Sequence, residues 1–198
     1  MNCLHASVLA VALTTAAIAP SVAQDLMYSP NPIADVVSEL RIGGHIHDVH
    51  YAMLPFMVNE WEYDNIGDIS FDVLFRTPDL DAFRWIGSPR PEIGATISLN
   101  GYESLAHLGL TWQLPVFDTP IYLEGTFGAA IHNGYLTNAP VGYSSFGCRV
   151  NFYERFGIGA HVSDNVTATL TYEHTSNAGL CSDNAGLSNV GLRVGWKF

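Results

Sequence analysis

Apolar and polar residues alternate along eight separate segments of the chain, with a period of two that is typical of β-strands. The last segment shows the pattern most clearly, because its apolar face carries Val190, Leu192, Val194, Trp196 and Phe198. The seven earlier segments cover residues 40–46, 69–75, 93–99, 106–114, 121–131, 150–162 and 166–172. Their other faces hold polar residues such as Arg41, Asp72, Glu92, Glu124 and Thr169. Eight strands with one apolar and one polar face predict an all-β fold, an eight-stranded antiparallel transmembrane β-barrel.

The first residues of the chain have the pattern of a cleaved signal peptide. Residues 6–20 are apolar and rich in small side chains, and Ser21-Val22-Ala23 is a small-x-small cleavage signal. We therefore expect a signal peptide over residues 1–23, an N-terminal periplasmic segment over 24–37, and the barrel over 38–198. The alternative is an uncleaved helical anchor, but the apolar stretch is short and contains threonines.

An even number of strands places both ends of the barrel on the periplasmic side. Residues 118–120 and 163–165 are then periplasmic turns, and residues 48–65, 132–145 and 178–186 are outer loops. The stretch 77–91 is long for a periplasmic turn, and we expect a short helix around residues 80–85 within it.

Composition and charge support an exported membrane protein. Charged residues make up only 14% of the chain, against about 25% in soluble domains. There are 19 acidic and 8 basic side chains, a balance that argues against nucleic acid as a partner. Cys3 belongs to the signal peptide, so Cys148 and Cys181 remain as an even pair in an oxidising compartment. They predict one disulfide, and two unpaired thiols are the alternative.

His174 and Ser176 continue the lipid-facing side of the seventh strand, because residues two apart on a strand share a face. A histidine can act as the base that activates a serine hydroxyl. If the last hairpin pairs Ser176 with Ser188, Ser176 lies about 25 Å above the periplasmic edge, where lipid ester bonds lie. A polar fringe at the membrane surface is the alternative interpretation of the pair.

The surrounding residues resemble a known family. The run Glu173-His174-Thr175-Ser176-Asn177-Ala178-Gly179-Leu180, followed by Asn184, Gly186 and Gly191-Leu192-Arg193-Val194-Gly195, is similar to the lipid A 3-O-deacylases of the PagL type. The match is strong over residues 146–198. The resemblance implies an eight-stranded outer-membrane barrel that removes the 3-linked hydroxyacyl chain from lipid A of lipopolysaccharide, a carboxylic ester hydrolase without a cofactor.

Carried over to this sequence, the resemblance implies that Ser176 is the nucleophile and His174 its base. Asn177 and Asn184 correspond to residues near the oxyanion hole, whose donors stabilise the charge of the tetrahedral intermediate. The sequence departs from the family at Ser188, which stands where the family has the glutamate that orients the histidine. A serine carries no negative charge to stabilise an imidazolium.

The barrel pattern offers a replacement for that glutamate. If residues 163–165 form the turn, Glu154 lies opposite His174 on the same outward face, about 5 Å from it. A lone carboxylate facing lipid is costly without a partner, and we expect His174 to be that partner. A bulge that turns Glu154 inward is the alternative. The same register places Cys148 opposite Leu180, next to Cys181.

Other sites are weaker. His45, His47 and His50 resemble a metal cluster, but no ligand spacing accompanies them, and we expect a polar network and no metal site. Two rival functions stay open, a non-catalytic structural or adhesive barrel and a lipid A acyltransferase barrel. The sequence also leaves open whether the barrel forms a homodimer.

Overall fold

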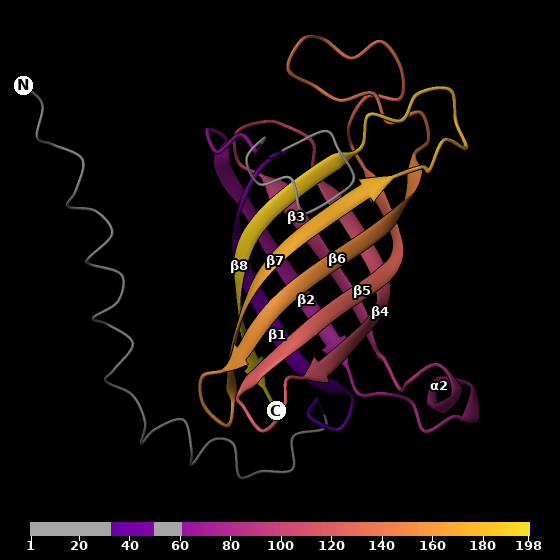
Figure 1. Cartoon of the computed structure of the whole chain (residues 1–198). Coiled ribbons are helices and arrows are strands. Elements are labelled where there is room, and N and C mark those ends of the chain that lie inside the picture. The colour runs from indigo at the N-terminus through magenta and orange to yellow at the C-terminus, as the bar shows by residue number, and fades with distance from the viewer. Residues whose placement is uncertain (1–32, 50–60) are drawn as a thin grey trace, which may run out of the picture. The chain divides into compact units, whose positions relative to one another are not determined.

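The computed structural model describes residues 33–49 and 61–198, and its strands form one closed antiparallel barrel (Figure 1). Each strand pairs with its neighbours in the sequence, and β1 closes the barrel against β8. The strands are β1 (Val37–Ile46), β2 (Ile66–Phe75), β3 (Arg90–Ser98), β4 (Leu105–Pro115), β5 (Ile121–His132), β6 (Val150–His161), β7 (Val166–Ser176) and β8 (Leu187–Lys197). The predicted eight-stranded fold is confirmed. The predicted signal peptide, Cys3, His50 and most of segment 24–37 lie outside the described residues.

The alternation of side chains follows the predicted faces. Leu192, Val194 and Trp196 of β8 point outward and are between 42% and 54% exposed. Arg193, which lies between them in the sequence, is completely buried inside the barrel. The apolar side chains therefore cover the outer wall and the charged ones fill the lumen, which is the arrangement of a transmembrane barrel.

Ion pairs between neighbouring and facing strands fill the lumen. Arg155 donates to Glu92 at 2.6 Å, and Arg193 donates to Glu173 at 2.6 Å and to Asp72 at 2.9 Å. Near the periplasmic end, Arg41 bonds Glu124 at 2.6 Å and Glu39 at 2.9 Å. Buried charges are tolerated because each has an opposite charge and hydrogen bonds. The lumen is thus a packed polar core.

The connections differ at the two ends of the barrel. The turns after β4 and β6 are short, and the segment after β2 carries the helix α2 (Asp81–Trp85), as the sequence predicted. Longer segments at the other end precede β6 and β8, in the predicted outer loops (Figure 1). No helix among the described residues is long and apolar enough to cross a membrane.

Candidate active site

The turn between β6 and β7 sets the register that the sequence predicted. The backbone of Val162 donates to Val166, and Glu154 lies directly opposite His174. Phe152 is the partner of Ser176 in the same ladder. The register of β6 and β7 is the predicted one, and it puts His174 and Ser176 on the outward face. The turn is so short that the two strands have little freedom to slip.

The register between β7 and β8 differs from the prediction. Ser188 lies opposite His174, and the ladder ends at the pair Thr175 and Leu187, one residue before Ser176. The assumed pairing of Ser176 with Ser188 is therefore wrong by two residues. The connection 177–186 is long enough to leave the register undetermined by sequence, because only tight turns fix strand pairing.

The corrected register places a hydroxyl group against the imidazole of His174. Ser188 Oγ lies 2.8 Å from His174 Nδ1, and the Tyr172 hydroxyl donates to the same oxygen at 3.0 Å. When Nδ1–H donates to Ser188, the other ring nitrogen, Nε2, is the unprotonated one and can accept a proton. The sequence analysis considered Ser188 as a strand partner of Ser176 and as a position without the family's charge, but not as a hydrogen-bond partner of His174. It did not single out Tyr172, because the contact between its hydroxyl group and Ser188 depends on the register of β7 and β8.

Both candidate catalytic side chains are covered although they lie on the outward face. His174 is 6% exposed and Ser176 is 7% exposed. The ring of Trp61 stacks on Tyr172 at a centroid distance of 5.9 Å, and Gly186 approaches the His174 ring. Within the described part of the chain, Ser176 Oγ and His174 Nε2 have no hydrogen-bond partner, so both remain available to each other and to a substrate.

Glu154 faces His174 across the strand pair, half-buried on the outer wall. Its carboxylate makes no hydrogen bond or ion pair with any described residue, and His174 Nδ1 is bonded to Ser188 instead. The structure thus brings Glu154 beside the histidine without a direct bond between them.

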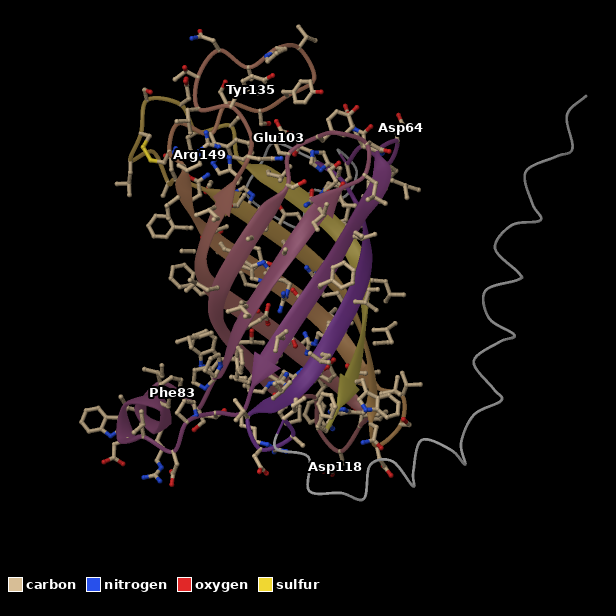
Figure 2. All side chains as sticks on the ribbon, turned by 180° about the vertical axis from the view of Figure 1, so that it is seen from behind. Asp64, Phe83, Glu103, Asp118, Tyr135 and Arg149 are labelled. Atoms are coloured by element: carbon tan, nitrogen blue, oxygen red, sulfur yellow. A yellow bond between two sulfur atoms is a disulfide. The ribbon has the colours of Figure 1, made fainter. Side chains whose placement is uncertain are left out.

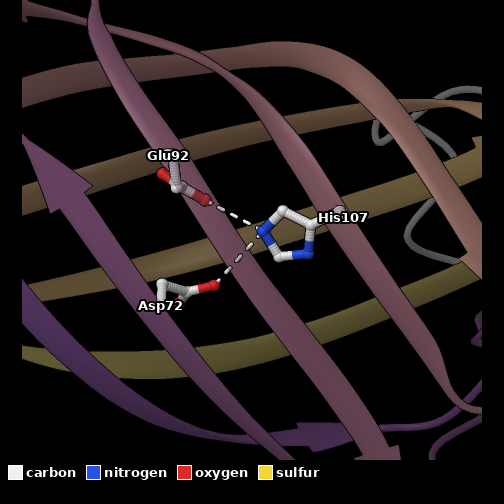
Figure 3. A group of neighbouring side chains, drawn as sticks. All are labelled: Asp72, Glu92 and His107. Atoms are coloured by element: carbon white, nitrogen blue, oxygen red, sulfur yellow. Dashed lines mark hydrogen bonds and ion pairs between the residues drawn. The ribbon is translucent and has the colours of Figure 1, made fainter.

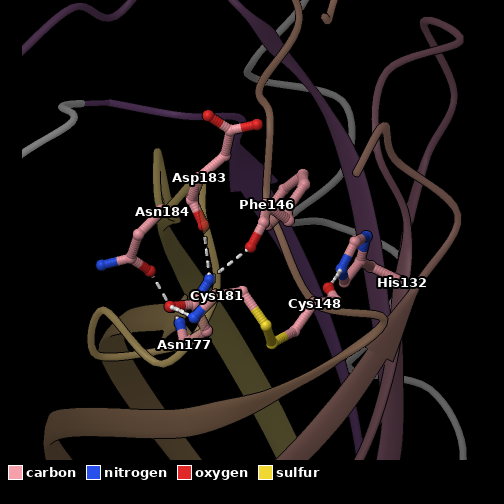
Figure 4. The surroundings of a disulfide bond; sticks show 7 residues. All are labelled: His132, Phe146, Cys148, Asn177, Cys181, Asp183 and Asn184. Atoms are coloured by element: carbon pink, nitrogen blue, oxygen red, sulfur yellow. Dashed lines mark hydrogen bonds between the residues drawn. A yellow bond between two sulfur atoms is a disulfide. The ribbon is translucent and has the colours of Figure 1, made fainter. Parts of the chain in front are cut away.

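Asn177 and Asn184 organise the loop that follows Ser176 (Figure 4). The side chain of Asn177 donates to the carbonyl oxygens of Phe146 and Asp183, both at 2.6 Å. Its backbone N–H donates to the side-chain oxygen of Asn184 at 2.8 Å. The N–H groups of Asn177 are therefore engaged within the protein, and the two asparagines hold the loop in shape.

A disulfide between Cys148 and Cys181 ties the same loop to the start of β6, as predicted (Figure 4). Their Cα atoms are 5.8 Å apart. Gly147 precedes Cys148 at φ +73°, and a Cβ there would lie 2.0 Å from the carbonyl oxygen of Asp183. Only glycine permits this close approach of the two loops.

The comparisons with known proteins agree with this arrangement. The family model of lipid A 3-O-deacylase (PagL) matches residues 60–197, well over half of the chain. The chain belongs to the PagL family. The members of this family are ester hydrolases of the outer membrane, and the barrel is accordingly an outer-membrane protein.

Solved structures show the same fold. The crystal structure of the outer-membrane enzyme PagL has a TM-score of 0.55 and 15% identity, and covers 81% of this chain and 100% of its own. The N-terminal β-barrel domain of Pseudomonas aeruginosa OprF has a TM-score of 0.50 and 11% identity, and covers 82% and 99%. At these identities the likeness concerns the fold alone. No curated protein sequence matches the chain.

The outer wall of this PagL-family barrel has an apolar pocket next to Ser176. The pocket has a volume of about 180 Å³ and is lined by Ala129, Cys148, Val150, Asn151, Phe152, Asn177 and Leu180. Phe152 is the strand partner of Ser176, and Asn177 is its neighbour in the sequence. The pocket therefore offers apolar surface beside the candidate nucleophile.

One group of lumen residues has the composition of a metal site. Oxygen atoms of Asp72 and Glu92 lie 3.4 Å and 3.0 Å from His107 Nε2 (Figure 3). Arg155 and Arg193 already neutralise these two carboxylates. A cation would have to displace guanidinium groups that are fully buried, so the group fits an ion-pair network better than a metal site.

Two of the three histidines that the sequence analysis singled out, His45 and His47, are among the described residues, and both lie in polar networks. His45 bonds Ser70 at 2.8 Å. His47, just beyond β1, bonds Asp68 at 2.7 Å and lies 3.4 Å from Glu103. Burial by itself lowers the pKa of His47, but the hydrogen bonds to Asp68 and Glu103 outweigh it and raise the pKa to about 9. His47 is therefore a cation at neutral pH that joins the outer ends of the strands.

Proposed function

We propose that Ser176 and His174 carry out the family's reaction in this chain, the hydrolysis of the 3-O-linked hydroxyacyl ester of lipid A in the outer leaflet. The observation that carries the proposal is the hydrogen bond between His174 Nδ1 and Ser188. In the tautomer whose Nδ1–H donates to Ser188, Nε2 is the proton acceptor, and Ser176 is the next residue on the same face of β7. The proposal takes this tautomer, in which a base adjacent to the nucleophile can accept its proton.

The reaction proceeds through an acyl-enzyme. Ser176 Oγ attacks the ester carbonyl carbon while His174 Nε2 takes the hydroxyl proton. The tetrahedral intermediate collapses, the bond to the sugar oxygen breaks, and His174 returns its proton to that oxygen. A water molecule then attacks the acyl-serine with His174 again as base, which releases the hydroxy fatty acid and restores Ser176.

The oxyanion is stabilised by the loop that Asn177 and Asn184 hold in shape. The amide N–H groups of Ala178 and Gly179 follow Ser176 closely, and neither has an acceptor among the residues that the structure describes. Both residues have positive φ angles, +54° and +79°, which turn the backbone sharply after Ser176. We assign the donors to these amides and a supporting role to the asparagines.

Glu154 supplies negative charge when the imidazolium forms. Its carboxylate is on the strand next to His174 and on the same side of the wall. In the ground state Ser188 holds the imidazole, and Glu154 then acts through the electric field, which is strong in a lipid-facing, partly buried position. This division of roles replaces the single glutamate of the family pattern.

The apolar pocket beside Ser176 takes the first part of the hydroxyacyl chain. Val150, Phe152 and Leu180 expose apolar surface there, and an acyl chain is transferred favourably from lipid or water to such a wall.

Mass spectra of lipid A test the proposal in cells. Cells expressing the chain should lose one hydroxyacyl group from lipid A, and Ser176→Ala and His174→Asn should each abolish the loss while the barrel stays folded. Folding is checked by the heat-modifiable mobility of the barrel on gels. An unchanged lipid A with the parent chain favours the structural or adhesive function, and a gained acyl chain favours the acyltransferase. A folded Ser176→Ala variant with full activity contradicts the assignment of the nucleophile.

The role of Glu154 is tested separately with purified protein. Glu154→Gln keeps the shape of the side chain and removes its charge, so kcat should fall by about tenfold to a hundredfold, less than for a directly bonded triad acid. The matched control is Glu62→Gln in the outer loop. A Glu154→Gln variant as active as the parent would leave a Ser176–His174 dyad with Ser188 as its only support.

A further inference from the structure

Arg149 is the single lysine or arginine in the outer loops of the barrel. The sequence has 8 such residues. Arg41, Arg155 and Arg193 lie in the lumen, and Arg76, Arg84, Arg90 and Lys197 lie at the periplasmic end. The outer loops otherwise carry acidic residues such as Glu62, Asp64 and Asp183. Arg149 is therefore the one guanidinium group at this acidic end of the barrel.

The protein holds the guanidinium group of Arg149 in one orientation. Its Nη1 donates to the carbonyl oxygens of His132 and Gly134, at 2.7 Å and 2.9 Å. Its Nη2 and Nε have no acceptor, and the side chain no carboxylate partner, in the described part of the chain. An exposed guanidinium that is fixed on one edge presents its other edge to an anion.

Arg149 lines a pocket of about 430 Å³ between two outer loops. Figure 2 labels three of the lining residues, Glu103, Tyr135 and Arg149, at this end of the barrel. The other polar and aromatic side chains of the pocket are Tyr102, Glu103, Asn133, Tyr135 and Tyr143. The ring of Tyr143 contacts both other tyrosine rings, with centroid distances of 5.8 Å to Tyr102 and 5.7 Å to Tyr135. Aromatic faces with hydroxyl groups suit a ligand with both C–H and O–H groups, such as a sugar ring.

The acidic member of the pocket, Glu103, has a partner on each of its carboxylate oxygens. One oxygen of Glu103 accepts from the backbone of Ser144 at 2.8 Å, and the other faces the cationic His47 at 3.4 Å. Both interactions keep the pKa of the Glu103 carboxyl low against the effect of burial, which by itself raises it. Both oxygens of Glu103 thus have partners other than Arg149.

The pocket is connected to the loop that follows Ser176. Phe146, in the same outer loop as the pocket residues, accepts a hydrogen bond from Asn177, and Cys148, beside Arg149, is bonded to Cys181. The loop that carries Arg149 is thus tied to the segment that follows Ser176.

We propose that this pocket binds the anionic sugar-phosphate headgroup of the substrate, with Arg149 as the phosphate ligand and the tyrosines against the sugar. The inference rests on the proposed function, because it takes the substrate to be lipid A, a phosphorylated glucosamine disaccharide. The headgroup contact fixes which ester of the lipid meets Ser176, and the acyl pocket alone could not do so.

The test compares two substrates, phosphorylated lipid A and lipid A from which the phosphates have been removed, in micelles with the full-length barrel. For Arg149→Gln, KM for the phosphorylated substrate should rise by about tenfold with little change in kcat, as loss of a charge-assisted contact predicts. On the dephosphorylated substrate, parent and variant should have the same KM. Arg149→Lys should recover part of the difference, and Arg84→Gln, on exposed α2, is the control for charge removal.

Two results would overturn the inference. One is an Arg149→Gln variant with the parent's KM, and the other is a KM that rises equally on both substrates. Inorganic phosphate at millimolar concentration lacks the sugar and the acyl chains, so it should compete with the phosphorylated substrate only weakly, and this competition should disappear in Arg149→Gln.

The failure of the proposed function would look different. Binding of phosphorylated lipid A to folded Ser176→Ala, followed by tryptophan fluorescence, should weaken by the same factor when Arg149→Gln is added. If Ser176→Ala hydrolyses lipid A, the nucleophile is wrongly assigned, but the Arg149 comparison still decides the headgroup site. If Arg149→Gln has no effect in either background while Ser176→Ala is inactive, only the headgroup site is wrong.

Discussion

Ser188 has a role that its residue type alone did not suggest. It stands where the family pattern has a glutamate, and a serine at that position looks like the loss of a catalytic group. In the structure its hydroxyl lies between His174 and Tyr172, at 2.8 Å and 3.0 Å. Residue 188 therefore still orients the imidazole of His174, but it lacks the negative charge of the family's glutamate.

Replacement of Ser188 tests this role. Ser188→Ala leaves His174 Nδ1 without its partner and no longer selects one tautomer, so kcat should fall by about tenfold, the value of one neutral hydrogen bond. Ser188→Thr keeps the hydroxyl and should stay within a few-fold of the parent. The measurement is single-turnover deacylation by folded protein. Equal activity in Ser188→Ala and the parent would show that the hydrogen bond does not orient the base.

At the scale of the strands, turn length decided what could be predicted. The short turn 163–165 fixes β6 against β7, and the pair Glu154 and His174 followed from the sequence. The longer connection 177–186 does not fix the register of β8 against β7, so the sequence could not determine it. The predicted partner of Ser176 was wrong for that reason. The contacts of Asn177 and the covering of His174 by neighbouring residues also depend on loops, whose path no periodicity encodes.

The outer ends of the strands give a prediction for pH. His47 has a folded pKa of about 9, above the value of about 6.5 in unfolded chains. Its contribution to stability is therefore complete below about pH 6.5 and is lost as the pH rises to about 9. The free energy of unfolding should fall between these values, and the fall should be smaller in His47→Gln. A parent protein without such a decrease, or a variant that keeps all of it, would contradict the assigned contacts.

The overall fold was the feature that the sequence predicted best. Alternation over eight segments specifies an outer apolar wall and a polar lumen, and the number of strands then follows from counting. The pairing of charges within the lumen was not predictable, because Arg155 and Glu92 come from strands that are not neighbours in the sequence. A closed barrel brings such strands face to face, and only the three-dimensional structure shows which charges meet.

The charged lumen should contribute strongly to the stability of the barrel. Arg155→Met leaves Glu92 buried without its main cation, and a broken buried pair typically costs about 3–5 kcal/mol. Urea-induced unfolding in lipid vesicles measures the loss, with Arg84→Met on exposed α2 as the control. If the two variants unfold at the same urea concentration, the lumen network is not what holds the strands together.

The central claim is that Ser176 is a nucleophile activated by His174, and covalent labelling tests it most directly. A lipid-like fluorophosphonate reacts with an activated serine hydroxyl, which displaces fluoride and gives a stable adduct. Incubation of the folded barrel followed by peptide mass mapping should find one adduct, on Ser176, formed in step with the loss of activity. The rate of labelling should fall at least about a hundredfold in His174→Asn. An enzyme that loses activity with the adduct on another residue, or that stays active with Ser176 labelled, would contradict the account.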